Sequence, residues 1–304
     1  MINRHLGKAA AALTLAALCL PIGAHAQDAF GPTPATPAAQ SFKLGKLQLI
    51  ALHDAQVVFP NNAKIFGVDA GAAAVSKVLQ ANGLPTDRIT VSLNALIVRD
   101  GHHIVLLDTG LGPKAHGSLM GSLNAAGIAP GSVTDVLITH SHGDHVGGLL
   151  DAAGNDAFPN ATIRMSAVEW QAMKGRTNAA DMVKAISSHV VPFTPGKPIL
   201  PGITPLASYG HTKGHVGYQI VSGKQKLFDI GDTVHSSIIS LAKPDWAVSF
   251  DGDKPEAEAN RAKTLSALVK SHELIFAPHF PFPGVGYIKA DGDHFKWDPT
   301  EKAE

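Results

Sequence analysis

The chain has 304 residues, enough for one large α/β domain or two small ones, and its hydrophobic share of 45% is ample for a core. Lys plus Arg equals Asp plus Glu at 25 each, so the formal charge is zero. This balance argues against a protein that binds nucleic acid through a basic surface, and no nucleic-acid partner is expected.

Residues 1–26 have the pattern of a secretory signal peptide. Two basic residues precede an apolar run over residues 9–20, which is short for a membrane span, and Ala24-His25-Ala26 has the small residues of a cleavage site. Cleavage after Ala26 predicts a periplasmic or secreted protein that keeps no membrane anchor. Cys19 is the single cysteine of the sequence and lies in this segment. The mature protein would therefore have no disulfide and no thiolate ligand for a metal.

The next segments predict an arm, a strand and a loop. Residues 27–42 contain several prolines and predict a flexible N-terminal arm before a single domain over residues 43–304. Residues 43–52 alternate in polarity and predict a first strand, which ends at Asp54. The Asp54 carboxylate is either a support for a metal-bound histidine or an ordinary strand-end residue. The loop expected over residues 57–72 is aromatic, and it either forms the lip of a substrate pocket or simply packs.

The densest group of chemically active side chains follows a predicted buried strand over residues 136–139. It reads His140-Ser141-His142-Gly143-Asp144-His145. Alternate residues of an extended chain point the same way, so His140 and His142 are expected to converge on one metal ion. Gly143 allows a sharp turn, after which Asp144 and His145 can face a second ion. A polar surface turn with incidental histidines is the alternative, and the density of the motif disfavours it.

This H-x-H-x-D-H pattern resembles the signature of the metallo-β-lactamase superfamily. Three later segments resemble further parts of that family's pattern, each at or just past the end of a predicted strand: Gly210-His211-Thr212-Lys213-Gly214-His215, Gly231-Asp232 and Pro278-His279. The resemblance implies that His211 and His279 bind metal and that Asp232 bridges two metals. It also implies that Asp108 orients a metal ligand from behind, whereas His215 packs or hydrogen-bonds nearby. The implied fold is a four-layer αβ/βα sandwich, in which two mixed sheets are flanked by helices.

Asp232 and the absence of a mature cysteine make a β-lactamase less favoured than the methyl parathion hydrolase and dinuclear lactonase branch. In that branch, one ion would be held by His140, His142 and His211, and the other by Asp144, His145 and His279. Asp232 would contact both ions. Imidazoles and carboxylates suit two Zn²⁺, although Mn, Co or Fe fit the same ligands. Such a pair lowers the pKa of a bridging water, and the resulting hydroxide would attack a lactone or ester carbonyl, as in an acyl-homoserine lactone or an aryl ester.

Two other functions stay open. One is cleavage of an organophosphate phosphotriester, and the other is a non-hydrolytic metal-binding or redox scaffold. His235 stands where many lactonases of this fold have a tyrosine, so it either donates a hydrogen bond to the substrate or lines the pocket. The candidate catalytic residues are Asp144, Asp232 and His235. The expected partner is a small-molecule substrate. The preference of the enzyme among substrates is expected to depend on the loops over residues 57–72 and 280–287. A homodimer is left open.

Overall fold

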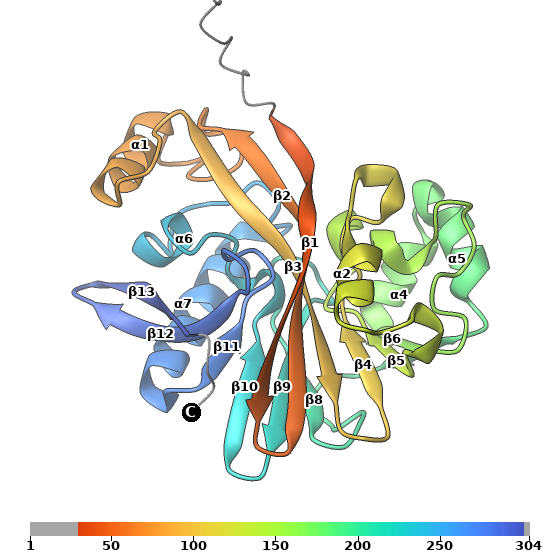
Figure 1. The fold of residues 1–304 in the computed structure, drawn as a ribbon. Coiled ribbons are helices and arrows are strands. Elements are labelled where there is room, and N and C mark those ends of the chain that lie inside the picture. Colours follow the sequence, from red (N-terminus) through yellow and green to blue (C-terminus); the bar gives the residue numbers. More distant parts are fainter. Residues whose placement is uncertain (1–29, 301–304) are drawn as a thin grey trace, which may run out of the picture.

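The computed structural model describes residues 30–300, and the expected signal peptide lies outside this range. Two sheets pack against each other, and helices cover their outer faces (Figure 1). The expected α/β sandwich of two mixed sheets flanked by helices is confirmed.

The first sheet is antiparallel over its first four strands and parallel beyond them. Its strands follow chain order: β1 (Gly31–Leu44), β2 (Leu47–Pro60), β3 (Arg88–Arg99), β4 (Ile104–Leu107), β5 (Asp135–Leu137), β6 (Thr162–Ser166) and β7 (Val190–Phe193). In the second sheet the pair β10–β11 is parallel and the other pairs are antiparallel. Its spatial order is β13 (His294–Pro299), β12 (Val285–Asp291), β11 (Leu274–Phe276), β10 (Gln225–Asp229), β9 (Val216–Ser222) and β8 (Ile203–Ala207).

The α-helices are α1 (Ala72–Ala81), α2 (Leu119–Ala125), α3 (Gly143–Val146), α4 (Ala167–Lys174), α5 (Ala180–Ile186), α6 (Ile239–Ala242) and α7 (Lys254–Ser271). Short 3₁₀ segments are η1 (Pro113–Ala115), η2 (Pro130–Ser132), η3 (Gly147–Leu149), η4 (Thr177–Ala179) and η5 (Gly231–Thr233). Within residues 30–300, no helix is long and apolar enough to cross a membrane.

The core follows from the two-residue period of the strands. On β2, Leu49 and Ala51 face the layer between the sheets, whereas Ile50 and Leu52 face the helices of the first sheet. The outer face of the second sheet packs against α7 through apolar side chains such as Leu265. Each buried aliphatic side chain of this size stabilises the fold by about 1.5–3 kcal/mol. The loops that carry the predicted ligands therefore start from well-packed strands.

A smaller apolar cluster lies apart from these layers. The ends of β2 and β3 extend beyond the sandwich and pack with α1 and the segment around α6, as Figure 1 shows for the elements. Phe59, Phe66 and Val91 belong to this cluster. The predicted loop over residues 57–72 is therefore partly wrong, because β2 continues to Pro60.

The expectation of a flexible arm over residues 27–42 is wrong from Gly31 onwards. This segment is β1, which pairs with β2 from Gly31 opposite Val58 to Leu44 opposite Leu47. Its prolines fit because β1 is an edge strand, where a residue without an N–H is tolerated. Gly45, at φ +58°, opens the turn between β1 and β2, so the single strand expected over residues 43–52 is a hairpin.

Candidate metal centre

The seven predicted metal ligands meet at one edge of the sandwich. They come from four loops: residues 140–145 after β5, His211 between β8 and β9, Asp232 after β10, and His279 after β11. These strands belong to both sheets, so the centre straddles the interface between them. The ligands gather in two groups that share Asp232.

The first group, called here the three-histidine half, consists of His140, His142 and His211. His211 Nε2 lies 3.1 Å from His140 Nε2 and 2.9 Å from His142 Nδ1. The second group, called the mixed half, consists of Asp144, His145 and His279. Asp144 Oδ2 lies 3.6 Å from His145 Nε2 and 3.8 Å from His279 Nε2.

Asp232 lies between the halves and presents one carboxylate oxygen to each. Its Oδ2 is 3.3 Å from His211 Nε2 and 3.8 Å from His140 Nε2. Its Oδ1 is 2.9 Å from His279 Nε2 and 3.1 Å from His145 Nε2. This arrangement is what a bridging carboxylate needs. Asp229, at the end of β10, instead accepts the backbone N–H of Gly231 over 3.1 Å.

Asp108 orients the ligand loop from behind. The His145 Nδ1–H donates to Asp108 Oδ2 over 2.7 Å, and the Thr139 hydroxyl donates to the same carboxylate over 2.8 Å. His140 Nδ1 is 3.1 Å from that hydroxyl oxygen and is therefore the donor, since the hydroxyl hydrogen is already used. In their neutral form, both imidazoles consequently turn the Nε2 lone pair toward the centre. Asp108 itself has φ +57°, a strained backbone that the surrounding bonds hold in place.

Two more ligand imidazoles, those of His211 and His279, are fixed in the same way. His211 Nδ1 donates to Asp251 Oδ1 over 3.0 Å, and His279 Nδ1 donates to the Ser92 carbonyl over 3.2 Å. Asp251 in turn accepts from Arg261, whose side chain is fully buried on α7. Each bonded Nδ1 leaves the Nε2 lone pair for a cation.

Unpartnered polar atoms test whether a metal fits. His145 Nε2 and Asp232 Oδ1 are buried and have no hydrogen-bond partner. Lone pairs of the three-histidine half also converge within 3.1 Å, which is unfavourable unless a cation lies among them. Imidazole nitrogens with carboxylate oxygens, and no thiolate, form the donor set of a zinc site. The residues fit a dinuclear metal centre.

The electrostatics favour binding of cations. Burial lowers the pKa of His140 and His142, and it lowers the pKa of His211 to about 3, so these imidazoles are neutral ligands. For His145 and His279 burial also acts downward, but nearby carboxylates, Asp232 above all, outweigh it and raise the pKa. A metal ion would replace those protons as the positive charge beside Asp232.

Of the two alternatives left open for Asp54, support of a metal-bound histidine is not favoured, because its carboxylate accepts from backbone groups instead. Asp54 occupies a bulge in β2, and its carboxylate accepts from the backbone N–H groups of Leu111 and Leu119, both over 2.8 Å. A Cβ on Gly110 would lie 2.3 Å from this carboxylate, which explains why glycine stands there. Asp54 therefore fixes the loop over residues 110–119.

Two further histidines flank Asp232. His215, expected to pack or hydrogen-bond, donates from Nδ1 to the Ser208 carbonyl and accepts the Asp232 backbone N–H at Nε2, over 2.7 and 2.9 Å. His235 is buried, its Nε2 lies 3.4 Å from Asp232 Oδ2, and neither ring nitrogen has a hydrogen-bond partner.

Sequence reasoning missed Glu169, Asp251 and Arg261. Glu169 contacts two of the loops that carry ligands, Asp251 accepts a hydrogen bond from the ligand His211, and Arg261 pairs with Asp251. Glu169 accepts hydrogen bonds from both the 140–145 loop and the 211–214 loop. A signal for Glu169 was present, because Ser166 and Glu169 have the spacing of a helix capping box. Ser166 does cap α4, but the Glu169 side chain turns to the loops instead.

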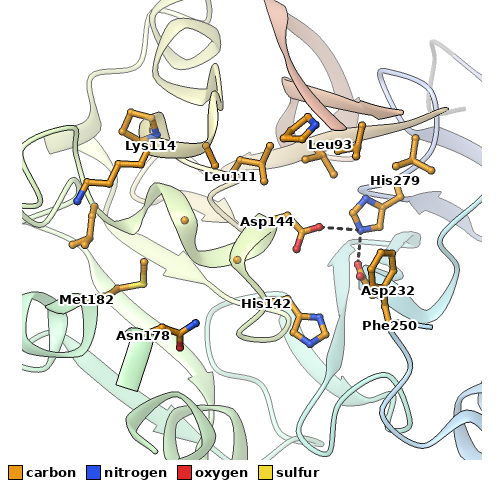
Figure 2. A pocket seen from close by; sticks show the side chains of 18 of the residues that line it. Leu93, Leu111, Lys114, His142, Asp144, Asn178, Met182, Asp232, Phe250 and His279 are labelled. Carbon is orange, nitrogen blue, oxygen red and sulfur yellow. Dashed lines mark ion pairs between the residues drawn. The ribbon is translucent and has the colours of Figure 1, made fainter. Parts of the chain in front are cut away.

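A cavity of about 740 Å³ opens on the centre. Figure 2 shows Asp144 and His142 in its middle, with Leu93, Phe250 and His279 on one side and Lys114, Asn178 and Met182 on the other. The apolar side includes Phe59 and Phe66, so the aromatic segment both packs in its own cluster and lines the pocket. Residues 280–287 do not line this cavity, contrary to expectation.

Comparisons with known proteins agree with this fold. The AidC structure, a dizinc quorum-quenching lactonase in complex with a product, N-hexanoyl-L-homoserine, superposes with a TM-score of 0.82 at 28% identity, covering 87% of this chain and 98% of that one. The hydrolase AbOPH superposes with a TM-score of 0.78 at 27% identity, covering 88% and 98%.

Among curated proteins, Metallo-beta-lactamase domain-containing protein 1 of Homo sapiens is 45% identical over 62 residues, which are 20% of this chain and 21% of that protein. This chain thus spans about a fifth of that relative's length. The profile of the metallo-beta-lactamase superfamily matches residues 89–279, which is more than half of the chain. The chain belongs to the metallo-beta-lactamase superfamily.

Proposed function

We propose that this protein uses two zinc ions to hydrolyse a small-molecule lactone or ester, with an acyl-homoserine lactone or an aryl ester as the substrate class. One observation carries the proposal: the 740 Å³ cavity opens onto Asp144, Asp232 and His279 at the metal centre. A cavity of this size suits a ligand of drug-like dimensions. The similarity to AidC supports the lactone in particular.

The residues divide the work between binding and chemistry. The apolar wall of Val57, Phe59, Phe66 and Val91 would take the acyl or aryl part of the substrate and exclude water there. The scissile carbonyl would then lie at the metal centre, where bound zinc supplies acidity to a water molecule and positive charge to the substrate oxygen. Asp232 and Asp144 would hold and move protons as the leaving oxygen departs.

His235 is proposed to face the substrate. It lines the cavity, and both ring nitrogens lack hydrogen-bond partners. The family resemblance implies that it stands where many lactonases have a tyrosine. An N–H from this ring would assist a lactone, whose alkoxide is a poor leaving group, more than an aryl ester. His235→Ala should therefore lower turnover of lactones more than that of aryl esters. Equal retention of both activities would remove His235 from the chemistry.

A phosphotriesterase is the second candidate. The supporting observation is that no tyrosine stands at position 235, since an aryl phosphotriester releases a phenolate that needs no proton donor. A non-hydrolytic redox scaffold is the third, and two bound irons with a redox signal would favour it over two zincs.

The deciding experiment is a substrate screen with the zinc-loaded mature protein. It compares acyl-homoserine lactones, aryl esters, a phosphotriester and a β-lactam, with Asp232→Ala as the inactive control. The proposal expects lactones or esters to turn over fastest and the β-lactam to persist. Faster cleavage of the phosphotriester would favour the second candidate, and no cleavage by zinc-loaded protein would contradict hydrolysis.

We also propose export to the periplasm or the medium, supported by the signal-like composition of residues 1–26. The mature protein is expected to begin at Gln27. Mass spectrometry of protein from the periplasmic fraction tests this, and a full-length chain confined to the cytoplasm would contradict it.

A further inference from the structure

Glu169 is a buried carboxylate close to the centre that is not one of the ligands. It lies near the start of α4 and is 2% exposed. Its two oxygens face two different loops. Oε2 accepts the backbone N–H of Ser141 over 2.9 Å and its hydroxyl over 2.6 Å. Oε1 accepts the backbone N–H of Gly214 over 3.1 Å and the hydroxyl of Thr212.

Ser141 separates the two ligands His140 and His142, and all three of its polar groups are held. Glu169 takes its N–H and its hydroxyl, and Arg176 donates to its carbonyl over 2.6 Å. With the Ser141 backbone fixed, the alternate side chains on either side of it are fixed in direction.

The other loop carries His211 and is held just as closely. Thr212 follows this ligand directly, and Ser166 donates to the Gly214 carbonyl over 2.8 Å. A Cβ on Gly214 would lie 2.7 Å from Ser166 Oγ and 2.9 Å from Glu169 Oε1. Glycine is therefore required for the loop to approach α4 so closely.

We propose that Glu169 is a positioning residue that sets the spacing of these two loops and thereby the zinc affinity of the three-histidine half. The mixed half does not rely on it, because its imidazoles are oriented by Asp108 and the Ser92 carbonyl. The hydrogen bonds to Glu169 outweigh its burial and lower its pKa, so the carboxylate is charged at neutral pH and accepts from all four donors. This inference rests on the two-zinc centre of the proposed function.

The test compares zinc binding by the full-length mature protein and its variants. Glu169→Gln keeps the size of the side chain but replaces one carboxylate oxygen with an amide NH₂ group. Both loops present only hydrogen-bond donors to residue 169, so this NH₂ group would face donors and lose the hydrogen bonds to one loop. Gln171→Ala, on an exposed position of the same helix, is the matched control. Zinc affinities are measured by competition with a chromophoric chelator, and native mass spectrometry counts the bound ions.

Glu169→Gln is expected to weaken one zinc site by about tenfold or more, the usual effect of losing a supporting hydrogen bond, and to leave the other within about threefold. His142→Ala identifies the affected site, because adding Glu169→Gln to it should cause no further loss of zinc. Thr212→Val removes only the hydrogen bond from the Thr212 hydroxyl to Glu169, so it should weaken zinc binding by the three-histidine half to a smaller extent. This milder variant keeps the inference testable if Glu169→Gln fails to fold.

Two results would overturn the inference. One is wild-type affinity at both sites in Glu169→Gln. The other is equal weakening of both sites alongside a lower melting temperature of the metal-free protein, which marks a purely structural role. These readouts do not involve substrate. If the wild type binds two zincs in this pattern yet cleaves no lactone or ester, the proposed function fails and the role of Glu169 stands.

Discussion

The buried ion pair behind His211 offers a quantitative test of how the centre is supported. Arg261 and Asp251 are both fully buried, and their side chains meet at 2.6 Å. The guanidinium also donates to the carbonyls of Thr233, Pro244 and Trp246. Arg261→Met removes all four hydrogen bonds and leaves the Asp251 carboxylate without its cation. Breaking one partner of such a pair lowers the free energy of unfolding by about 3–5 kcal/mol.

The assay is urea denaturation of the metal-free protein, repeated with saturating zinc. Lys263→Met, on the exposed face of the same helix, is the control and should change the unfolding free energy by less than about 0.5 kcal/mol. Asp251→Asn keeps an oxygen for His211 but removes the charge. The double variant Arg261→Met/Asp251→Asn should lose less than the sum of the single losses, by about 2 kcal/mol. Additive losses, or an Arg261→Met loss as small as the control, would refute the reasoning.

Three further outcomes are expected. Asp232→Ala should lose at least one zinc and most activity, since the residue contacts both halves; metal analysis with full zinc content and normal turnover would be inconsistent with this. Asp108→Asn should weaken zinc binding by about 10–100-fold in a chelator competition, because it alters the acceptor of His145; unchanged affinity would exclude the supporting role. Burial raises the pKa of Asp229 well above its usual value, so the contribution of Asp229 to the free energy of unfolding falls as pH rises from about 4, by about 1.4 kcal/mol per pH unit until the raised pKa is reached. Asp229→Asn avoids that loss, and its stability advantage in urea denaturation should grow between pH 4 and pH 7; a constant difference would contradict it.

The positions that converge in the centre could be predicted because each lies at or just after a strand end. An apolar run followed by His140-Ser141-His142 signals both the strand and the direction of its histidines. His211, Asp232 and His279 needed the family resemblance, since strand order alone does not reveal which ends meet. The structure brings all of these side chains together.

Supporting residues were harder to predict because their partners are far away in the sequence. Glu169 is 28 residues from Ser141, and Asp251 is 40 residues from His211. Nothing in the local pattern of α7 distinguishes Arg261 from an exposed basic residue of the same helix. Asp54 was ambiguous for the same reason, since its bulge depends on pairing with β3.

The N-terminal strand was missed for a different physical reason. Proline removes backbone donors and is typical of unpaired segments, so residues 31–42 matched a flexible arm. On a sheet edge, however, the missing donors cost little, and pairing with β2 on one side is enough. Local composition therefore could not distinguish an edge strand from a linker.

The central claim is that the three-histidine half and the mixed half each hold a metal ion, with Asp232 between them. Anomalous X-ray scattering at the zinc absorption edge, on crystals of the zinc-loaded protein, tests it most directly. We predict two peaks, one within bonding distance of each half and both beside the Asp232 carboxylate. A single peak, or peaks that lie away from these side chains, would contradict the dinuclear centre and the hydrolytic function derived from it.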